Sequence, residues 1–129
     1  MTAKTETATR VFKTAWFSKA ASKARISDAA LCAAIKQAMQ GQAVDLGGGV
    51  FKKRLNENRH RSILITKAGQ YWIYAYLFAK KDRDNIGADE LAEFKKLAAL
   101  YSRQTSSIFD AEVKQGSLLE ICHAEKDDL

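Results

Sequence analysis

Three apolar segments with strand-like alternation, joined by short polar turns, constrain the fold more than any other feature of this sequence. They cover residues 50–55, 61–67 and 71–80, and the turns between them read NENRH and AGQ. Alternating apolar runs separated by polar turns of this length are typical of antiparallel strands. The sequence therefore predicts an antiparallel meander in the middle of the chain.

Helical periodicity dominates before this meander. Residues 10–17 begin as a short strand that runs into a small helix, and a second helix follows over residues 28–40. Ser27 and Asp28 provide its N-terminal cap, and Gly41 is expected to end it in a left-handed conformation. The run LGGG before the first meander strand predicts a turn or a close backbone approach rather than a phosphate-binding loop.

Helices return after the meander. Gly87 and Glu90 are placed as the cap and third residue of a long helix, which a short helix over residues 106–115 follows. Gly116 closes that helix, residues 117–122 form a last strand, and residues 123–129 are expected to be a disordered acidic tail. The predicted fold class is α+β, with N-terminal helices packed on a central antiparallel sheet and C-terminal helices after it.

Composition excludes several classes of protein. The longest apolar run, residues 71–79, is too short to cross a bilayer, and the polar N-terminus lacks the apolar core of a signal peptide, so we expect a cytoplasmic protein without membrane contact. Cys32 and Cys122 lack the spacing of a zinc site. We expect them to be small buried residues in a reducing compartment and not to form a disulfide.

The net charge of +6 is distributed unevenly along the chain. Residues 50–83 carry nine Lys and Arg against two Asp and Glu, whereas residues 84–129 carry five against ten. Most charge runs are solvated surface, but the basic residues of the middle block fall on predicted strands and their ends. This placement favours a face that binds anions.

Alternation along the first meander strand separates its side chains. Lys52 and Arg54 project from one face, which we expect to be exposed, while Phe51, Lys53 and Leu55 project from the other. The meander can bring further basic groups to the same concave surface. These are Arg59, His60, Arg61, Lys80, Lys81 and Arg83.

The residue types present favour cationic chemistry. We find no carboxylate pair on the sheet, no nucleophile beside a histidine and no metal cluster in the sequence, so no cofactor or metal is expected. Fixed cations suit the cleavage of RNA by its own 2′-hydroxyl, because negative charge accumulates on the phosphate oxygens in the transition state. Arg54 and Arg61 are expected to be exposed. His60 is either an acid or base or a turn histidine without a catalytic role.

The aromatic residues of the third strand allow two interpretations. Trp72, Tyr74, Tyr76 and Phe78 share one face if the strand alternates regularly. Such a stripe can stack on bases, but a core stripe under packed helices is the favoured interpretation, since the predicted helices need an apolar sheet face to cover.

The order of elements and four segments resemble the RelE/ParE toxin superfamily of type II toxin–antitoxin systems, and within it the HigB-like, phage-derived RelE-type branch. The segments are LGGGVFKKRL, RHRSI in place of the family's Gly-Tyr-Arg, YLFAKKDRDNI and the helix DELAEFKKLA. The resemblance covers residues 10–103 and implies one RelE-like domain over residues 1–129, with residues 104–129 as a C-terminal extension.

The resemblance implies a ribosome-dependent, metal-independent mRNA endoribonuclease that inhibits translation. By similarity, the catalytic cations are Lys52 and Arg54, Arg61 and Lys81, and the substrate-binding residues are Arg59, His60, Lys80 and Arg83. Implied partners are a cognate antitoxin of helix-turn-helix type, the ribosome and mRNA. Some relatives carry a C-terminal tyrosine that stacks on the RNA base, whereas this chain reads NIGADE there.

Two other functions remain open at this point. One is a ParE-like inhibitor of DNA gyrase, and the other is a nucleic-acid-binding module without catalysis. The basic residues at positions 52, 54 and 61 favour the nuclease over the gyrase inhibitor, because ParE-type chains generally lack such cations on the sheet.

Overall fold

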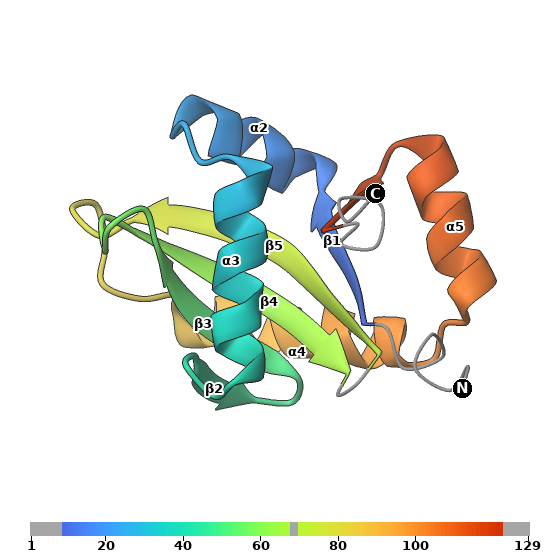
Figure 1. Ribbon diagram of the computed structural model, residues 1–129. Helices are drawn as coiled ribbons and strands as arrows, with labels where there is room; N and C mark the ends of the chain where they lie inside the picture. The colour runs from blue at the N-terminus through green and yellow to red at the C-terminus, as the bar shows by residue number, and fades with distance from the viewer. Residues whose placement is uncertain (1–8, 68–69, 123–129) are drawn as a thin grey trace.

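The computed structural model describes residues 9–67 and 70–122, in which helices cover both faces of one mixed sheet (Figure 1). The sheet order is β2-β3-β4-β5-β1-β6. In chain order the elements are β1 (Arg10–Thr14), α2 (Ala15–Lys23), α3 (Asp28–Met39), β2 (Val44–Gly47), β3 (Val50–Leu55), β4 (His60–Lys67), β5 (Tyr71–Ala79), α4 (Ala88–Ser102), α5 (Ser106–Gln115) and β6 (Leu118–Ile121). The predicted α+β class is confirmed.

The predicted meander is confirmed as β3, β4 and β5, which pair antiparallel in sequence order. The sheet is nevertheless mixed, because β1 lies beside β5 and runs parallel to it. A further strand, β2, was not predicted and pairs with β3. The glycines between β2 and β3 explain this sharp reversal, since Gly47, Gly48 and Gly49 have φ values of +90°, +63° and +85°.

The helix ends follow the predicted caps. The Ser27 hydroxyl accepts a hydrogen bond from Ala30 N at 3.1 Å, and Glu90 accepts one from Gly87 N at 2.7 Å. Gly41 and Gly116 follow α3 and α5 in the left-handed conformation, with φ of +93° and +88°. Side-chain and backbone caps of this kind satisfy groups that a helix end leaves unpaired.

A β-bulge in β5 corrects the prediction that its four aromatic side chains share one face. Ile63 pairs with Tyr76 but the next residue, Leu64, pairs with Tyr74, so Ala75 is an extra residue in the ladder. Trp72 and Tyr74 pack with the α2 and α3 side of the sheet, whereas Tyr76 and Phe78 pack with the α4 side. An inserted residue inverts alternation, which a regular period of two cannot anticipate.

The core occupies both faces of the sheet. On one face Phe17 of α2 and Leu31 and Ile35 of α3 are buried with Leu64 and Tyr74 of the sheet. On the opposite face lie Ala98 of α4 and Phe109 of α5, buried with apolar residues of β1, β3, β4 and β5. The sheet is therefore the middle layer of the molecule.

Cys32 and Cys122 form a disulfide, so the expectation of two unpaired cysteines is wrong. The bond joins α3 to the residue after β6, and the two Cα atoms are 5.5 Å apart despite a sequence separation of 90 residues. Sequence spacing could not reveal this, because the pair meets only when β6 adds to β1 and α3 packs on the sheet. The pairing also removes the argument for a reducing compartment.

No helix in the described part of the chain is long and apolar enough to span a membrane. The acidic tail predicted for residues 123–129 lies outside the described residues.

We predict that replacing both cysteines by serine lowers the free energy of unfolding by about 2–5 kcal/mol, because a disulfide that closes a long loop restricts the unfolded chain. Thermal unfolding of the oxidised wild-type chain, with and without dithiothreitol, measures this effect. The Cys32→Ser/Cys122→Ser double variant is the control, since its melting temperature should not respond to the reductant. Two titratable thiols in the denatured, unreduced wild-type chain would contradict the pairing.

Candidate functional site

The ends of three strands meet at one end of the sheet and bring the predicted basic residues together. Arg54 near the end of β3 is opposite Arg61 of β4, and Arg61 is opposite Phe78 of β5. The backbone N–H of Lys80 donates to the Arg59 carbonyl at 2.9 Å, which fastens the loop after β5 to the β3–β4 turn. We call this region, residues 52–61 and 78–83, the basic end.

The β3–β4 turn has an unusual backbone. Asn56, Glu57 and Asn58 all have positive φ, between +55° and +72°, a conformation that costs energy for residues with a Cβ. Side chains stabilise it: the Arg59 guanidinium donates to the Asn56 carbonyl at 3.2 Å, and Arg61 Nη1 donates to the Asn58 carbonyl at 3.0 Å. The turn is thus held in place by two of the basic residues themselves.

The alternation predicted for β3 is confirmed. Phe51 and Leu55 pack with the α3 side of the sheet, while Val50, in register with Lys52 and Arg54, is buried on the α4 side. The expectation that this second face is exposed is only partly right, because α4 covers it. Lys52 is half-buried and Arg54, closer to the strand end, is exposed.

Arg61 corrects the expectation of exposure, since only 8% of it is accessible. Its Nη1 donates to the carbonyls of Asn58 and His60, at 3.0 and 3.2 Å. None of the described residues accepts a hydrogen bond from its Nε or Nη2. The side chain is therefore anchored from one edge of the guanidinium, beneath the turn.

Most cations of the basic end have no ion-pair partner among the described residues. Arg10 pairs with Asp110 and Glu120 at 2.8 and 2.7 Å, and Lys13 pairs with Asp28 at 2.7 Å. Within residues 9–67 and 70–122, six basic-end cations form no ion pair. These are Lys52, Lys53, Arg54, Arg61, Lys80 and Lys81. The basic end is consequently a concentration of uncompensated positive charge.

Arg83 is the basic-end residue with the most internal contacts. Its guanidinium pairs with Glu90 of α4, its Nε donates to the Asn85 carbonyl at 2.9 Å, and its Cζ lies 5.6 Å from the centre of the Phe78 ring. The hydrogen bonds to Glu90 raise the pKa of Arg83. Arg83 thus connects the loop after β5 to α4 and to the sheet.

The surroundings of His60 favour a neutral imidazole. Its Nδ1 lies 3.1 Å from the Asn56 side-chain amide, which donates, so the remaining proton is assigned to Nε2. Burial lowers the pKa of His60, and the charges of Arg59 and Lys81 lower it further, against an opposite effect of Asp82. The exposed Lys81 thus contributes to the electrostatic environment of the imidazole.

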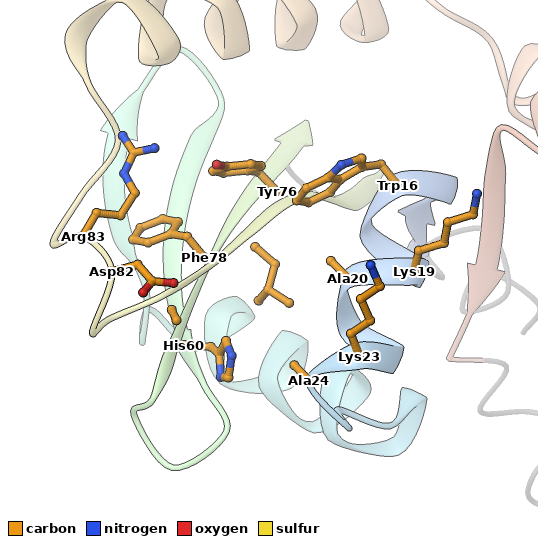
Figure 2. Close-up of a pocket in the computed structure, with 12 residues that line it drawn as sticks. Trp16, Lys19, Ala20, Lys23, Ala24, His60, Tyr76, Phe78, Asp82 and Arg83 are labelled. Carbon is orange, nitrogen blue, oxygen red and sulfur yellow. The ribbon is translucent and has the colours of Figure 1, made fainter.

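A cavity of about 640 Å³ opens between α2 and the end of β5 (Figure 2). His60, Asp82 and Arg83 line it from the basic end, and Tyr76 and Phe78 line it from β5. Helix α2 supplies the opposite wall. Its contributions are Trp16, Lys19, Ala20, Lys23 and Ala24.

Sequence reasoning missed the residues of α2, because Trp16 was assigned to the end of a strand and not to a helix. Lys19 and Lys23 are four residues apart in a short helix, and this spacing places them on the same side. That spacing was the available signal. No group of three or more potential metal ligands occurs among the described residues.

We predict that His60 titrates below pH 6.5 in the folded chain, and that the fold is stabilised by His60 above this pH. Because the folded-state pKa is lower than the unfolded one, this contribution is lost as the pH falls through the folded-state pKa. Titration of the imidazole resonances by NMR tests the shift, and His60→Gln assigns the resonance because the chain has only two histidines. A midpoint above 6.5 would show that a carboxylate, and not burial with neighbouring cations, controls the group.

Most of the chain matches a known protein family. The family model described as the RelE toxin of the RelE/RelB toxin–antitoxin system matches residues 9–121, which is most of the chain. The match extends past residue 103 and includes α5 and β6. No curated protein and no solved structure matches the chain significantly.

Proposed function

The chain belongs to the RelE family of toxins from toxin–antitoxin systems, and we propose that it is a ribosome-dependent endoribonuclease that cuts mRNA and so stops translation. The observation that carries this proposal is the concentration at the basic end of six cations that form no ion pair within the described residues. The HigB-like branch, suggested by the four sequence segments, is part of the same proposal.

The proposed reaction is attack of the RNA 2′-hydroxyl on the neighbouring phosphate. The oxygen–phosphorus bond to the 2′-oxygen forms, the bond to the 5′-oxygen of the next nucleotide breaks, and the proton of the 2′-hydroxyl leaves while the 5′-oxygen gains one. Negative charge rises on the non-bridging oxygens in between. Fixed cations stabilise that state more than the ground state, which is how they accelerate the reaction.

Arg54 and Arg61 are proposed to hold the scissile phosphate. They are cross-strand partners, so their backbones lie about 5 Å apart and their side chains leave the same face of the sheet. Arg61 is fixed through Nη1, and none of the described residues accepts a hydrogen bond from its other nitrogens. An arginine anchored in this way loses little freedom when it binds a phosphate, so the contact is preorganised.

Lys52 and Lys81 complete the proposed catalytic set from either side of this pair. Lys52 precedes Arg54 on the same face of β3, and Lys81 lies in the loop after β5 near His60. Lys80 and Arg59, joined through their backbones, are proposed to bind phosphates of the flanking nucleotides. Arg83 contributes by holding this loop against α4 through Glu90.

His60 is proposed to bind substrate and not to act as the base. Its Nδ1 accepts from Asn56, so no imidazole lone pair is free to take a proton while that bond exists. Its Nε2–H is a hydrogen-bond donor at the border of the cavity. Neutral His60 can therefore donate to RNA without adding to the local charge.

The toxin family implies an antitoxin partner, and we propose that the partner covers the basic end with acidic side chains, in a protein of helix-turn-helix type. An acidic partner would neutralise the uncompensated charge and exclude RNA at the same time. The same surface would then bind either the antitoxin or RNA.

We predict that Arg54→Ala lowers the rate of mRNA cleavage on translating ribosomes by a factor of about a hundred to a thousand, as expected for loss of one well-placed charge. Arg54→Lys should recover little of this rate, because an ammonium cannot form two parallel hydrogen bonds to a phosphate. Cleavage-site mapping by primer extension, with the purified chain added to a translation reaction, gives the rate.

The matched control for Arg54→Ala is Lys36→Ala, which removes a cation of α3 that is also exposed. This variant should cleave like the wild type, and all three variants should unfold at the same temperature as the wild type. Full activity of Arg54→Ala would refute the assigned role. If the wild-type chain leaves mRNA intact while DNA supercoiling collapses, the gyrase inhibitor replaces the nuclease; binding of RNA without either effect would indicate the non-catalytic module.

We further predict that the antitoxin complex weakens as the salt concentration rises, because salt screens contacts between opposite charges. Titration calorimetry at increasing sodium chloride measures the dependence. A Lys80→Ala/Lys81→Ala variant should show a shallower dependence on salt than wild type. An affinity independent of salt would place the antitoxin on an apolar surface away from the basic end.

A further inference from the structure

We propose that the cavity beside α2 is a binding site for one unpaired RNA base, which stacks on Trp16, next to the phosphate held by the basic end. The inference rests on the proposed function for the identity of its ligand. Trp16, Lys19 and Lys23, which α2 contributes to the cavity, lie in none of the four segments that resemble the toxin superfamily.

Trp16 is the first reason for assigning a base to this cavity. It is 52% exposed, although a tryptophan gains free energy by burial. One face of its ring stacks on Tyr76, with centroids 5.1 Å apart and planes 23° from parallel. A large aromatic ring that packs on a neighbouring ring and also borders a cavity can stack on another flat ring.

Further aromatic contacts follow along the cavity wall. The ring centroids of Tyr76 and Phe78 are 6.0 Å apart with their planes tilted by 34°, and Arg83 Cζ lies over the Phe78 ring at 5.6 Å from its centroid. Figure 2 shows Trp16, Tyr76, Phe78 and Arg83 following one another along one side of the cavity. This row runs from α2 to the basic end, so a base on Trp16 would belong to the same strand of RNA as a phosphate at Arg61.

The two arginines are neighbours of the cavity wall in the sheet. Phe78 of the cavity wall is the cross-strand partner of Arg61, which is the partner of Arg54. Neighbouring strands lie about 4.8 Å apart, so the backbones of the two arginines are about one and two strand spacings from that of Phe78. Successive nucleotides of one RNA strand can therefore extend from the cavity to the arginines.

Charge selects a nucleotide over an apolar ligand. Lys19 and Lys23 extend from α2 at the mouth of the cavity (Figure 2), and both are exposed. Together with Arg83 they outnumber Asp82, the single carboxylate among the lining residues. Lysines at this distance from a stacking ring suit the phosphates on either side of a stacked base.

The size and shape of the cavity also fit. Ala20 and Ala24 are the small residues of α2 that face it, and they leave its floor open. A volume of about 640 Å³ lies within the range of sites that hold small organic ligands and exceeds what one base needs. The base must be unpaired to enter, because the faces of a base within a double helix are covered by the bases stacked on it.

The test uses a short single-stranded RNA with 2′-O-methyl groups, which binds but has no free 2′-hydroxyl for cleavage. Titration into the full-length chain, followed by tryptophan fluorescence, should quench Trp16, because the only other tryptophan, Trp72, is buried. Trp16→Ala should weaken binding about tenfold or more, whereas Trp16→Phe should retain most of the affinity. Lys19→Ala and Lys23→Ala should each lower the slope of log affinity against log salt by about one.

Two controls separate this site from a general effect. Leu100→Ala removes an apolar residue of α4 that is 53% exposed, close to the 52% of Trp16, and should bind RNA like wild type. The same RNA with an abasic position should lose affinity for the wild-type chain but little for Trp16→Ala. Equal loss in both proteins would show that the base does not contact Trp16.

The outcomes distinguish this inference from the proposed function. If Trp16→Ala binds RNA as tightly as wild type while Arg54→Ala loses cleavage, the base site is wrong and the nuclease stands. If Trp16→Ala keeps RNA affinity but loses antitoxin affinity, the cavity is a protein-docking site and the inference is overturned. A wild-type chain that neither binds nor cleaves RNA overturns both.

Discussion

The site depends on the point where the pairing of β1 with β5 stops. The two strands pair only from Arg10 opposite Tyr71 to Lys13 opposite Tyr74, after which Thr14 caps α2 and the chain leaves the sheet. Beyond this point β5 continues to Ala79 and, among the described strands, pairs only with β4. The bulge at Ala75 lies at the first residue past the pairing, and it places Tyr76 and Phe78 on the α4 side. The cavity occupies the space between the protruding end of β5 and α2.

The edge of the sheet at β6 and the basic end differ in how their charges are compensated. The edge formed by β1, β6 and α5 contains the disulfide and the Arg10 network, in which one guanidinium connects Glu120 of β6 with Asp110 of α5. The described cations at the basic end lack such partners, apart from the pairs that involve Arg59 and Arg83. Like charges held close together repel, and the cost is reduced because three of them, Arg54, Lys80 and Lys81, are exposed to water.

The sequence predicts whatever depends on local pattern. Alternation identified the three meander strands and separated Lys52 and Arg54 from Phe51 and Leu55, and cap residues located the ends of α3 and α4.

Contacts between distant segments were not predictable. The parallel pairing of β1 with β5 and the Cys32–Cys122 disulfide depend on how the elements assemble, and a single inserted residue, Ala75, reversed the aromatic faces. The burial of Arg61 likewise follows from the turn that folds over it, and a strand pattern contains no information about that turn. The assignment of catalytic roles to the cations stays a prediction.

The separation of the two ends determines how far binding and stability can be studied independently. Arg54 and Trp16 are exposed, so their side chains add little to the buried core. Arg61 differs, because its Nη1 also holds the carbonyls of the strained turn. Removing it would leave these carbonyls to water and loosen three residues with positive φ. An activity lost with Arg61 therefore combines a missing charge with a displaced turn, whereas an activity lost with Arg54 reports the charge alone.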